Sequence, residues 1–271
     1  GGAPRGAPPQ FQSTRNNMLA LQPKNQEMKD LVLLAKSHKE TLDMKGQPAE
    51  VICAIDISGS MRSYYQSGQV QKIMDRMLAI ALNFDPDGQI QIIAFGIRAH
   101  DCGVVNLENY HKCVQYLDND VVRINENRLR LEKGTQYAPA INMAYEMAFG
   151  RDWQTLNTSR GLFRRRGRPM LNTPVANPFF TLFLTDGECS DRNETKKLVD
   201  LGSGLPLFTQ FAGFGHGFET LDAIDNMRGR VVDNAGVFTA DNLRINDDAL
   251  YQGMLNEFPD WLKATANKGW Y

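Results

Sequence analysis

Three short segments of the sequence carry side-chain oxygens at spacings that could bind a divalent metal ion. The first segment is Asp56-Ile57-Ser58-Gly59-Ser60-Met61, which begins at the end of the apolar run 50–58. Side chains two residues apart in an extended segment project to the same side, so Asp56, Ser58 and Ser60 can converge on one point. Gly59 allows the backbone to turn tightly between the two serines. The pattern therefore predicts an oxygen-rich loop at the end of a strand.

The second and third segments have the same character. They are Gly134-Thr135-Gln136-Tyr137-Ala138-Pro139, directly before an expected helix, and Leu184-Thr185-Asp186-Gly187-Glu188, at the end of the most apolar expected strand. The three segments together offer two carboxylates and three hydroxyls: Asp56, Asp186, Ser58, Ser60 and Thr135. Hard oxygen ligands of this kind suit Mg²⁺ with waters that complete an octahedron, and Mn²⁺ is the alternative.

The elements that must position these residues alternate between strands and helices along the chain. Apolar runs predict strands at 50–58, 89–96, 103–108, 177–185, 205–214 and 231–238, with 103–108 at an edge. Apolar residues at helical spacing predict helices at 25–45, 70–84, 110–117, 139–149, 192–201 and 247–266. This alternation predicts a doubly wound, mostly parallel six-stranded α/β sheet with one antiparallel edge strand and helices on both faces. Such sheets place their sites at the carboxyl ends of strands, where the oxygen-bearing segments are expected.

The length of 271 residues is typical of one large α/β domain. Residues 1–24, rich in Gly, Pro, Gln and Asn, are expected to form a flexible lead-in to a single domain over 25–271, which includes an inserted loop at 150–176. No apolar run approaches the roughly 20 residues that cross a bilayer, and the N-terminus has no signal-peptide pattern. The four cysteines have no metal-ligand spacing, which favours a reducing compartment and a cytoplasmic protein.

Other interpretations of the first segment lead to different functions. A lone Asp-x-Ser-x-Ser sequence could be a strand-end turn that caps a helix. Ser58 or Ser60 could be the nucleophile of a metal-dependent hydrolase acting on phosphoesters or esters. Their flanks do not form G-x-S-x-G, the four histidines show no triad relation to them, and the chain has no phosphate-binding G-x-x-x-x-G-K-[ST] loop. An enzyme is therefore the minor hypothesis.

The strings "AIDISGSM", "GTQYAP" and "FLTDGECSD", in this order, resemble the metal-ion-dependent adhesion site (MIDAS) of von Willebrand factor A (VWA) domains. The resemblance is strongest to the copine and tellurium-resistance (TerF-like) branch, and it extends from about residue 28 to the C-terminus. The strings that extend it are "LVLLAKSHKETL", "FDPDGQIQIIAFG", "FAGFG", "MRGRVVDNAGVF" and "LYQGMLNEFPDWLKATANKG". The three loops together make the match far more specific than the first loop alone.

The resemblance implies that Asp56, Ser58, Ser60, Thr135 and Asp186 surround one metal ion, some of them through water. In the family, one coordination position remains for an acidic residue of a protein partner. The resemblance therefore implies a metal-dependent protein-binding module, not an enzyme, whose partner supplies an Asp or Glu carboxylate. The TerF-like branch further suggests a stress-response setting of bacterial or phage origin.

Further residues are candidates for supporting the metal ion or contacting the partner: Gly59, Met61, Gly134, Tyr137, Gly187, Glu188 and His216. We expect Glu188 to face solvent, with support of the metal site as the alternative, and Asp191 to cap the helix that follows it.

The 150–176 loop contains an arginine-rich stretch at 160–168. Arg164, Arg165 and Arg166 in it could contact an anion or nucleic acid. Lys and Arg total 30 against 31 Asp and Glu, a balance that argues against nucleic acid and leaves partner recognition as the favoured role of this loop.

Overall fold

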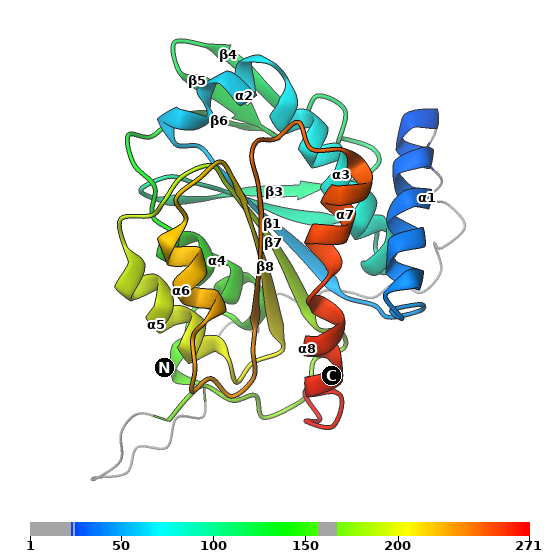
Figure 1. The fold of residues 1–271 in the computed structure, drawn as a ribbon, viewed down its shortest axis with the longest axis vertical. Helices are drawn as coiled ribbons and strands as arrows, with labels where there is room; N and C mark the ends of the chain where they lie inside the picture. The colour runs from blue at the N-terminus through cyan, green and yellow to red at the C-terminus, as the bar shows by residue number, and fades with distance from the viewer. Residues whose placement is uncertain (1–22, 24, 157–166) are drawn as a thin grey trace, which may run out of the picture.

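The computed structural model describes residues 23, 25–156 and 167–271. Its centre is a six-stranded sheet in the order β3-β2-β1-β7-β8-β9 (Figure 1). Neighbouring strands are parallel except for β2 and β3, which pair antiparallel at one edge. The predicted fold class is thereby confirmed. The strands are β1 Glu50–Asp56, β2 Ile90–Phe95, β3 Ala99–Val105, β7 Phe179–Thr185, β8 Leu207–Phe214 and β9 Ala235–Ala240.

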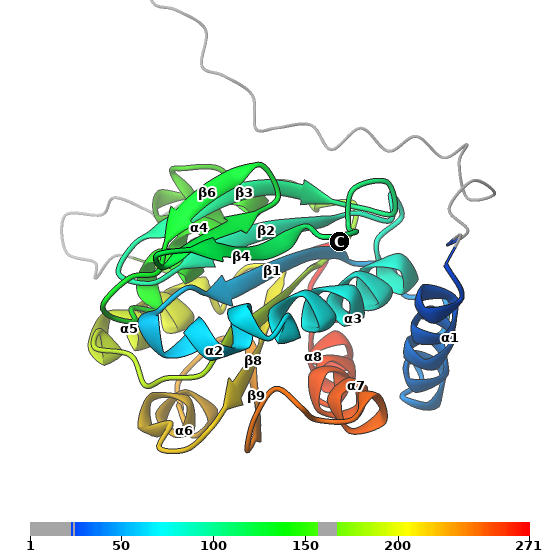
Figure 2. The ribbon, with the colours of Figure 1, turned by 90° about the horizontal axis from the view of Figure 1, so that it is seen from above.

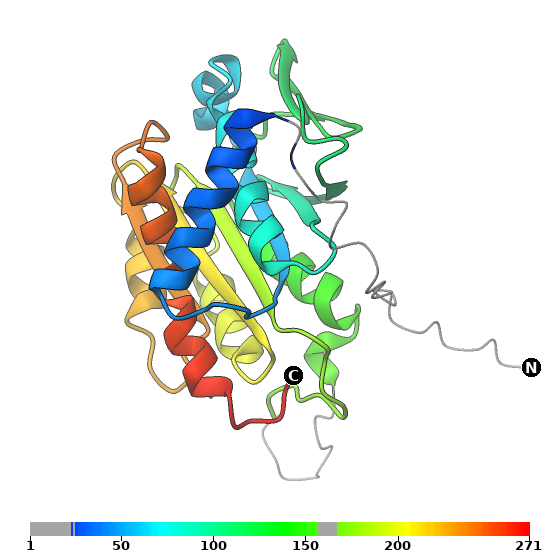
Figure 3. The same cartoon turned by 90° about the vertical axis from the view of Figure 1, so that its right-hand side faces the viewer.

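Helices cover both faces of the sheet, which explains the unbroken apolar runs of its central strands. Successive side chains of β1 enter opposite cores: Val51, Cys53 and Ile55 lie in one, and Ile52 and Ala54 in the other. The first core is covered by α1 Gln26–Thr41, α3 Gln69–Phe84, α7 Asp247–Leu255 and α8 Phe258–Thr265. The second is covered by α4 Ala138–Phe149, α5 Arg192–Gly202 and α6 Glu219–Asp225. Figure 3 shows the first layer from the side, with α1 packed along α3 and α7.

A second, three-stranded antiparallel sheet stands above the carboxyl ends of the main strands. It consists of β4 Val114–Asp118, β5 Val121–Ile124 and β6 Asn127–Arg130. Seen from above in Figure 2, β6 lies on the side of β3, and β4 lies toward α2 Arg62–Gln66. The helix predicted over 110–117 is therefore wrong. Asn119 and Asp120 both have positive φ, 48° and 61°, and form the two-residue turn that joins β4 to β5.

Other element boundaries also differ from the sequence prediction. The helix predicted over 247–266 is broken into α7 and α8, because Pro259 in the first turn of α8 cannot continue a preceding helix. The edge strand predicted at 103–108 runs over Ala99–Val105, and the last strand begins at Ala235 instead of 231. The arginines at 164–166 and nearly all of the expected flexible segment 1–24 lie outside the described residues.

Two findings bear on the environment of the chain. None of the helices in the described part is both long enough and apolar enough to cross a membrane. Cys53, Cys102, Cys113 and Cys189 are all buried, and none of them forms a disulfide.

Candidate metal centre

Asp56 is the last residue of β1 and is fully buried. One of its carboxylate oxygens accepts a hydrogen bond from the Ser58 amide at 2.6 Å, and the other accepts one from the Thr185 hydroxyl at 2.6 Å. The Tyr65 hydroxyl donates to the Asp56 carbonyl at 2.9 Å. Burial raises the pKa of Asp56 to about 6, although its hydrogen bonds act in the opposite direction. The carboxylate is thus fixed in place in a poorly solvated position.

A chain of side-chain contacts continues from the first loop to the third. The hydroxyls of Ser58 and Ser60 lie 3.0 Å apart, and the Ser60 hydroxyl donates to Asp186 Oδ1 at 2.7 Å. Burial also raises the pKa of Asp186. Ser58 is buried, Asp186 is half-buried and Ser60 is exposed, so the group of oxygens opens to solvent on the Ser60 side.

The second loop lies against the third. A Cβ atom added to Gly187 would be 3.7 Å from Thr135 Oγ1, which places the Thr135 hydroxyl directly beside the Asp186–Gly187 backbone. The Thr135 carbonyl accepts from the Ser190 amide at 3.0 Å. The buried Tyr137 donates its hydroxyl to the Gly187 carbonyl at 2.6 Å. The structure therefore brings all three oxygen-bearing loops to one place at the carboxyl edge of the sheet.

Asp191 connects the same two loops in a way that the sequence did not predict. Its carboxylate accepts from the amides of Tyr137 and Ala138, both at 2.9 Å, at the start of α4. It precedes α5 but makes no capping hydrogen bond to that helix, so the predicted cap of the following helix is wrong. The Asp191 carboxylate binds the start of α4 instead, because two free backbone amides there donate to the same side chain.

Glu132 is a residue that sequence reasoning missed. Its backbone pairs with the first loop, since Gly59 N donates to Glu132 O and Glu132 N donates to Ile57 O, each at 2.8 Å. Its carboxylate accepts from the backbone amides of Ile97 and Arg98 and lies 3.0 Å from His100 Nε2.

Burial alone would raise the pKa of Glu132, but the hydrogen bonds from His100 and from two backbone amides outweigh it and hold the pKa below its ordinary value. A Cβ at Gly96 would come within 2.6 Å of the Glu132 Cβ, so this approach requires glycine. No local motif marks Glu132, because its partners lie in the first loop, the turn between β2 and β3, and β3 itself.

The remaining candidates have varied surroundings. Met61 is buried, Gly134 packs against the Ile97 side chain, and His216 is exposed in the loop after β8. Glu188 is exposed as expected, yet its carboxylate also accepts from the Thr220 amide at 3.0 and 3.2 Å, in the first turn of α6. Glu188 thus ties the third loop to α6.

The donor set fits a hard divalent cation. The described residues contain no group of three or more His, Cys, Asp or Glu side chains arranged to hold a metal ion. Here two carboxylates are combined with three hydroxyls, which suits an ion such as Mg²⁺ that keeps several waters and takes only one or two protein carboxylates. Burial of both carboxylates, which penalises their negative charge, also favours a nearby cation.

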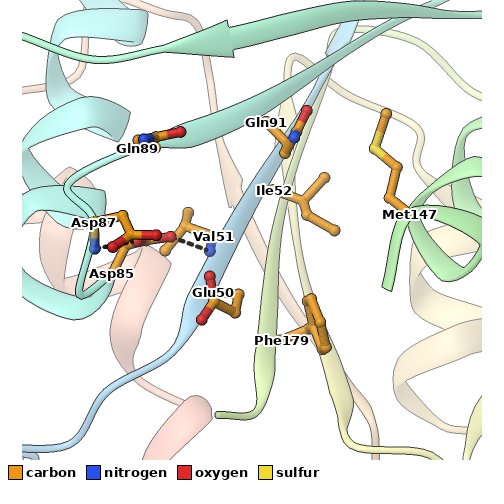
Figure 4. A pocket seen from close by; sticks show the side chains of 9 residues that line it. All are labelled: Glu50, Val51, Ile52, Asp85, Asp87, Gln89, Gln91, Met147 and Phe179. Atoms are coloured by element: carbon orange, nitrogen blue, oxygen red, sulfur yellow. Dashed lines mark hydrogen bonds between the residues drawn. The ribbon is translucent and has the colours of Figure 1, made fainter. Parts of the chain in front are cut away.

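The opposite end of β1 carries a second group of acidic residues, shown in Figure 4. Asp85 accepts from the amides of Asp87 at 2.8 Å and Val51 at 3.4 Å, and burial together with the nearby Glu50 raises the pKa of Asp85. The cavity there measures about 20 Å³, which is room for about one water molecule and not for a larger ligand. Because the Asp85 oxygens already have backbone partners, we assign no ligand to this end.

Comparison with known proteins gives one family and several relatives. The family model described as "vWA found in TerF C terminus" matches residues 48–271. The uncharacterized protein YcbR of Bacillus subtilis (strain 168) is 31% identical over 247 residues, which cover 89% of this chain and 90% of that protein.

Among solved structures, proximal thread matrix protein 1 from the mussel byssus (crystal form 2) is similar, with a TM-score of 0.50 and 15% identity. The similarity covers 76% of this chain and 46% of the mussel protein, so the chain spans about half the length of that protein and shares its fold alone. Another structure of the mussel protein is described as having a zinc-occupied MIDAS motif; its TM-score is 0.42 at 13% identity, over 76% of this chain and 46% of that one.

Proposed function

The chain belongs to the family of vWA domains found in the TerF C terminus, and on that premise we propose that it is a metal-dependent protein-binding module. Membership confirms the resemblance noted in the sequence. The observation that carries the proposal is the meeting of three loops: Ser58 bonds to Asp56 and to Ser60, Ser60 bonds to Asp186, and Thr135 lies beside the Asp186–Gly187 backbone. A site that is open to solvent on one side suits capture of a group from another molecule.

Each residue has a distinct task in this proposal. Asp56 and Asp186 supply negative charge, and Ser58, Ser60 and Thr135 supply neutral oxygens. A bound Mg²⁺, or Mn²⁺ in its place, would attract one further carboxylate, since two carboxylates offset its charge and the hydroxyls add none. The exposed position of Ser60 leaves that side accessible to an Asp or Glu of a protein partner.

Several contacts favour binding over hydrolysis. The hydroxyls of Ser58 and Ser60 contact each other and Asp186, not a histidine. Of the described histidines, His38 pairs with Asp248, His100 pairs with Glu132, and the other two make no hydrogen bond to either serine. A serine nucleophile needs an adjacent base to remove its proton, and the carboxylate beside Ser60 is Asp186, which the proposal assigns to the metal ion. We therefore propose a site without a catalytic step.

The TerF name of the family leads us to propose a biological setting as well. We place the module in a tellurium-resistance or stress-response system of bacterial or phage origin. The Bacillus relative, similar over nearly its whole length, is consistent with a bacterial setting.

A pull-down from native lysate tests the proposal. Immobilised wild-type protein should retain a partner in Mg²⁺ buffer and release it when a chelator is added. Thr135→Ala should lose this retention, because the hydroxyl beside Asp186 is removed while the buried core is unchanged. Thr41→Ala, an exposed threonine at the end of α1, is the matched control and should behave as wild type. Retention that persists in chelator, or in Thr135→Ala, would contradict the proposal.

A further inference from the structure

A groove of about 450 Å³ lies between β3 and β6, beside the first oxygen-bearing loop. Four of its lining side chains are cationic: Arg98, Arg128, Arg130 and Lys133. In the described part of the chain, Glu132 is the one acidic residue that lines it. The groove therefore carries an excess of positive charge, although the whole chain has a formal net charge of −1.

The positive charges in the groove are available to a ligand. Arg128, Arg130 and Lys133 are exposed, and within the described part of the chain none of them forms an ion pair. The Arg98 side chain is 77% exposed and lies 3.5 Å from Glu132. The Glu132 carboxylate, which accepts hydrogen bonds from two backbone amides and faces His100, offsets one of the four cationic charges and leaves the groove positive.

The groove adjoins the loops of the candidate metal centre. Glu132 pairs with Gly59 and Ile57 of the first loop, and Lys133 is two residues before Thr135. Ile97, which is 46% exposed, lies at the junction, where a Cβ on Gly134 would be 3.3 Å from its side chain. A chain that placed one side chain at the metal centre would pass Ile97 and enter the groove.

We propose that this groove binds an acidic segment of the protein partner. One carboxylate of that segment is directed to the metal ion, and the carboxylates next to it along the partner chain bind the cationic side chains of the groove. The assignment of one carboxylate to the metal ion rests on the proposed function, whereas the positive charge of the groove is independent of it. Opposite charge on the two surfaces would speed encounter and fix the direction of the bound segment. Ile97, Leu129 and Leu131 lie among the cationic groups and suit apolar side chains of a peptide. Among the described residues that line it, there is no Phe, Tyr or Trp on which nucleic-acid bases could stack.

A binding assay with defined probes tests the inference. The probe is a fluorescein-labelled peptide of eight glutamates, and the matched probe is the same length of glutamine, each measured in Mg²⁺ and in chelator. The variant Arg128→Gln/Arg130→Gln/Lys133→Gln should bind the acidic peptide about tenfold more weakly, as three exposed ion pairs are lost. Its Mn²⁺ affinity should remain that of wild type. Lys29→Gln/Lys36→Gln/Lys45→Gln removes three exposed charges on and next to α1 and should change neither.

The outcomes separate this inference from the proposed function. If the groove variant binds the acidic peptide as tightly as wild type, or if wild type does not prefer it to the glutamine peptide, the inference is overturned. If Thr135→Ala and chelator leave peptide binding unchanged while the groove variant loses it, the metal-dependent function fails and the groove assignment stands. A labelled single-stranded oligonucleotide that binds more tightly than the peptide, with the same loss in the groove variant, would also overturn the assignment of an acidic protein segment.

Discussion

Asp56 shows how single contacts prepare the candidate site. It is fully buried, and each of its carboxylate oxygens has one donor, the Ser58 amide and the Thr185 hydroxyl. A buried hydrogen-bond acceptor that loses its donor still carries the free-energy cost of its removal from water, with no hydrogen bond to offset that cost. Thr185 is therefore expected to hold Asp56 in place even without a direct role toward a ligand.

Two threonines of β7 differ in whether their hydroxyls have a hydrogen-bond partner. Thr185→Val preserves shape but removes the hydroxyl bonded to Asp56, and we expect it to lower the free energy of unfolding by about 1–3 kcal/mol. Thr181→Val is the control, because the Thr181 hydroxyl is buried without a hydrogen-bond partner, so its loss should be neutral or stabilising. Urea denaturation of both variants provides the measurement. Equal destabilisation by the two changes would show that the Thr185–Asp56 bond does not hold the carboxylate.

At the scale of elements, the start of α4 determines where Thr135 lies. Asp191 accepts from the first two amides of that region, and Ser190 donates to the Thr135 carbonyl. These contacts attach the loop before α4 to the loop after β7. Both loops carry oxygens of the candidate site, so the attachment controls their separation.

Asp191→Ala should therefore affect both stability and metal binding. Loss of a capping carboxylate lowers the free energy of unfolding by about 0.5–2 kcal/mol. Mn²⁺ affinity should fall about tenfold, as is typical when a residue that orients ligands is removed. Calorimetric titration and urea denaturation give the two values, with the exposed Asp241→Ala as control. Unchanged Mn²⁺ affinity in a destabilised Asp191→Ala protein would limit Asp191 to a structural role.

Sequence patterns predicted the elements with strong periodicity and missed those made by turns and distant contacts. The strands β1 and β7 are recognisable as unbroken apolar runs, because both of their faces are buried. The helix α3 is recognisable from apolar residues at helical spacing, because one stripe of it is buried. The sheet β4–β6 was missed, although Asn119-Asp120 is a favourable two-residue turn and was the available signal. The Glu132 and Asp191 contacts depend on strands and loops far along the chain, so no local pattern reveals them.

The whole molecule has two unlike ends. The carboxyl ends of the strands hold the three oxygen-bearing loops, with β4–β6 and α2 standing above them (Figure 1). The amino end of β1 has a small cavity, where the Asp85 carboxylate accepts from two backbone amides. This polarity follows the rule for open α/β sheets, in which sites form at the carboxyl ends of the strands. The sequence could predict the location of the site for that reason, whereas the cationic groove required the position of β6.

Calorimetric titration with Mn²⁺ decides whether these five side chains form one cation site. Wild-type protein should bind a single Mn²⁺ ion per chain, and Mg²⁺ should compete for it. Asp56→Asn, which retains the acceptor for the Ser58 amide, should abolish saturable binding, and Thr135→Ala should weaken it about tenfold or more. Thr41→Ala should bind as wild type does. Saturable Mn²⁺ binding that is unchanged in Asp56→Asn and Thr135→Ala, or its absence from the wild-type protein, would contradict the claim.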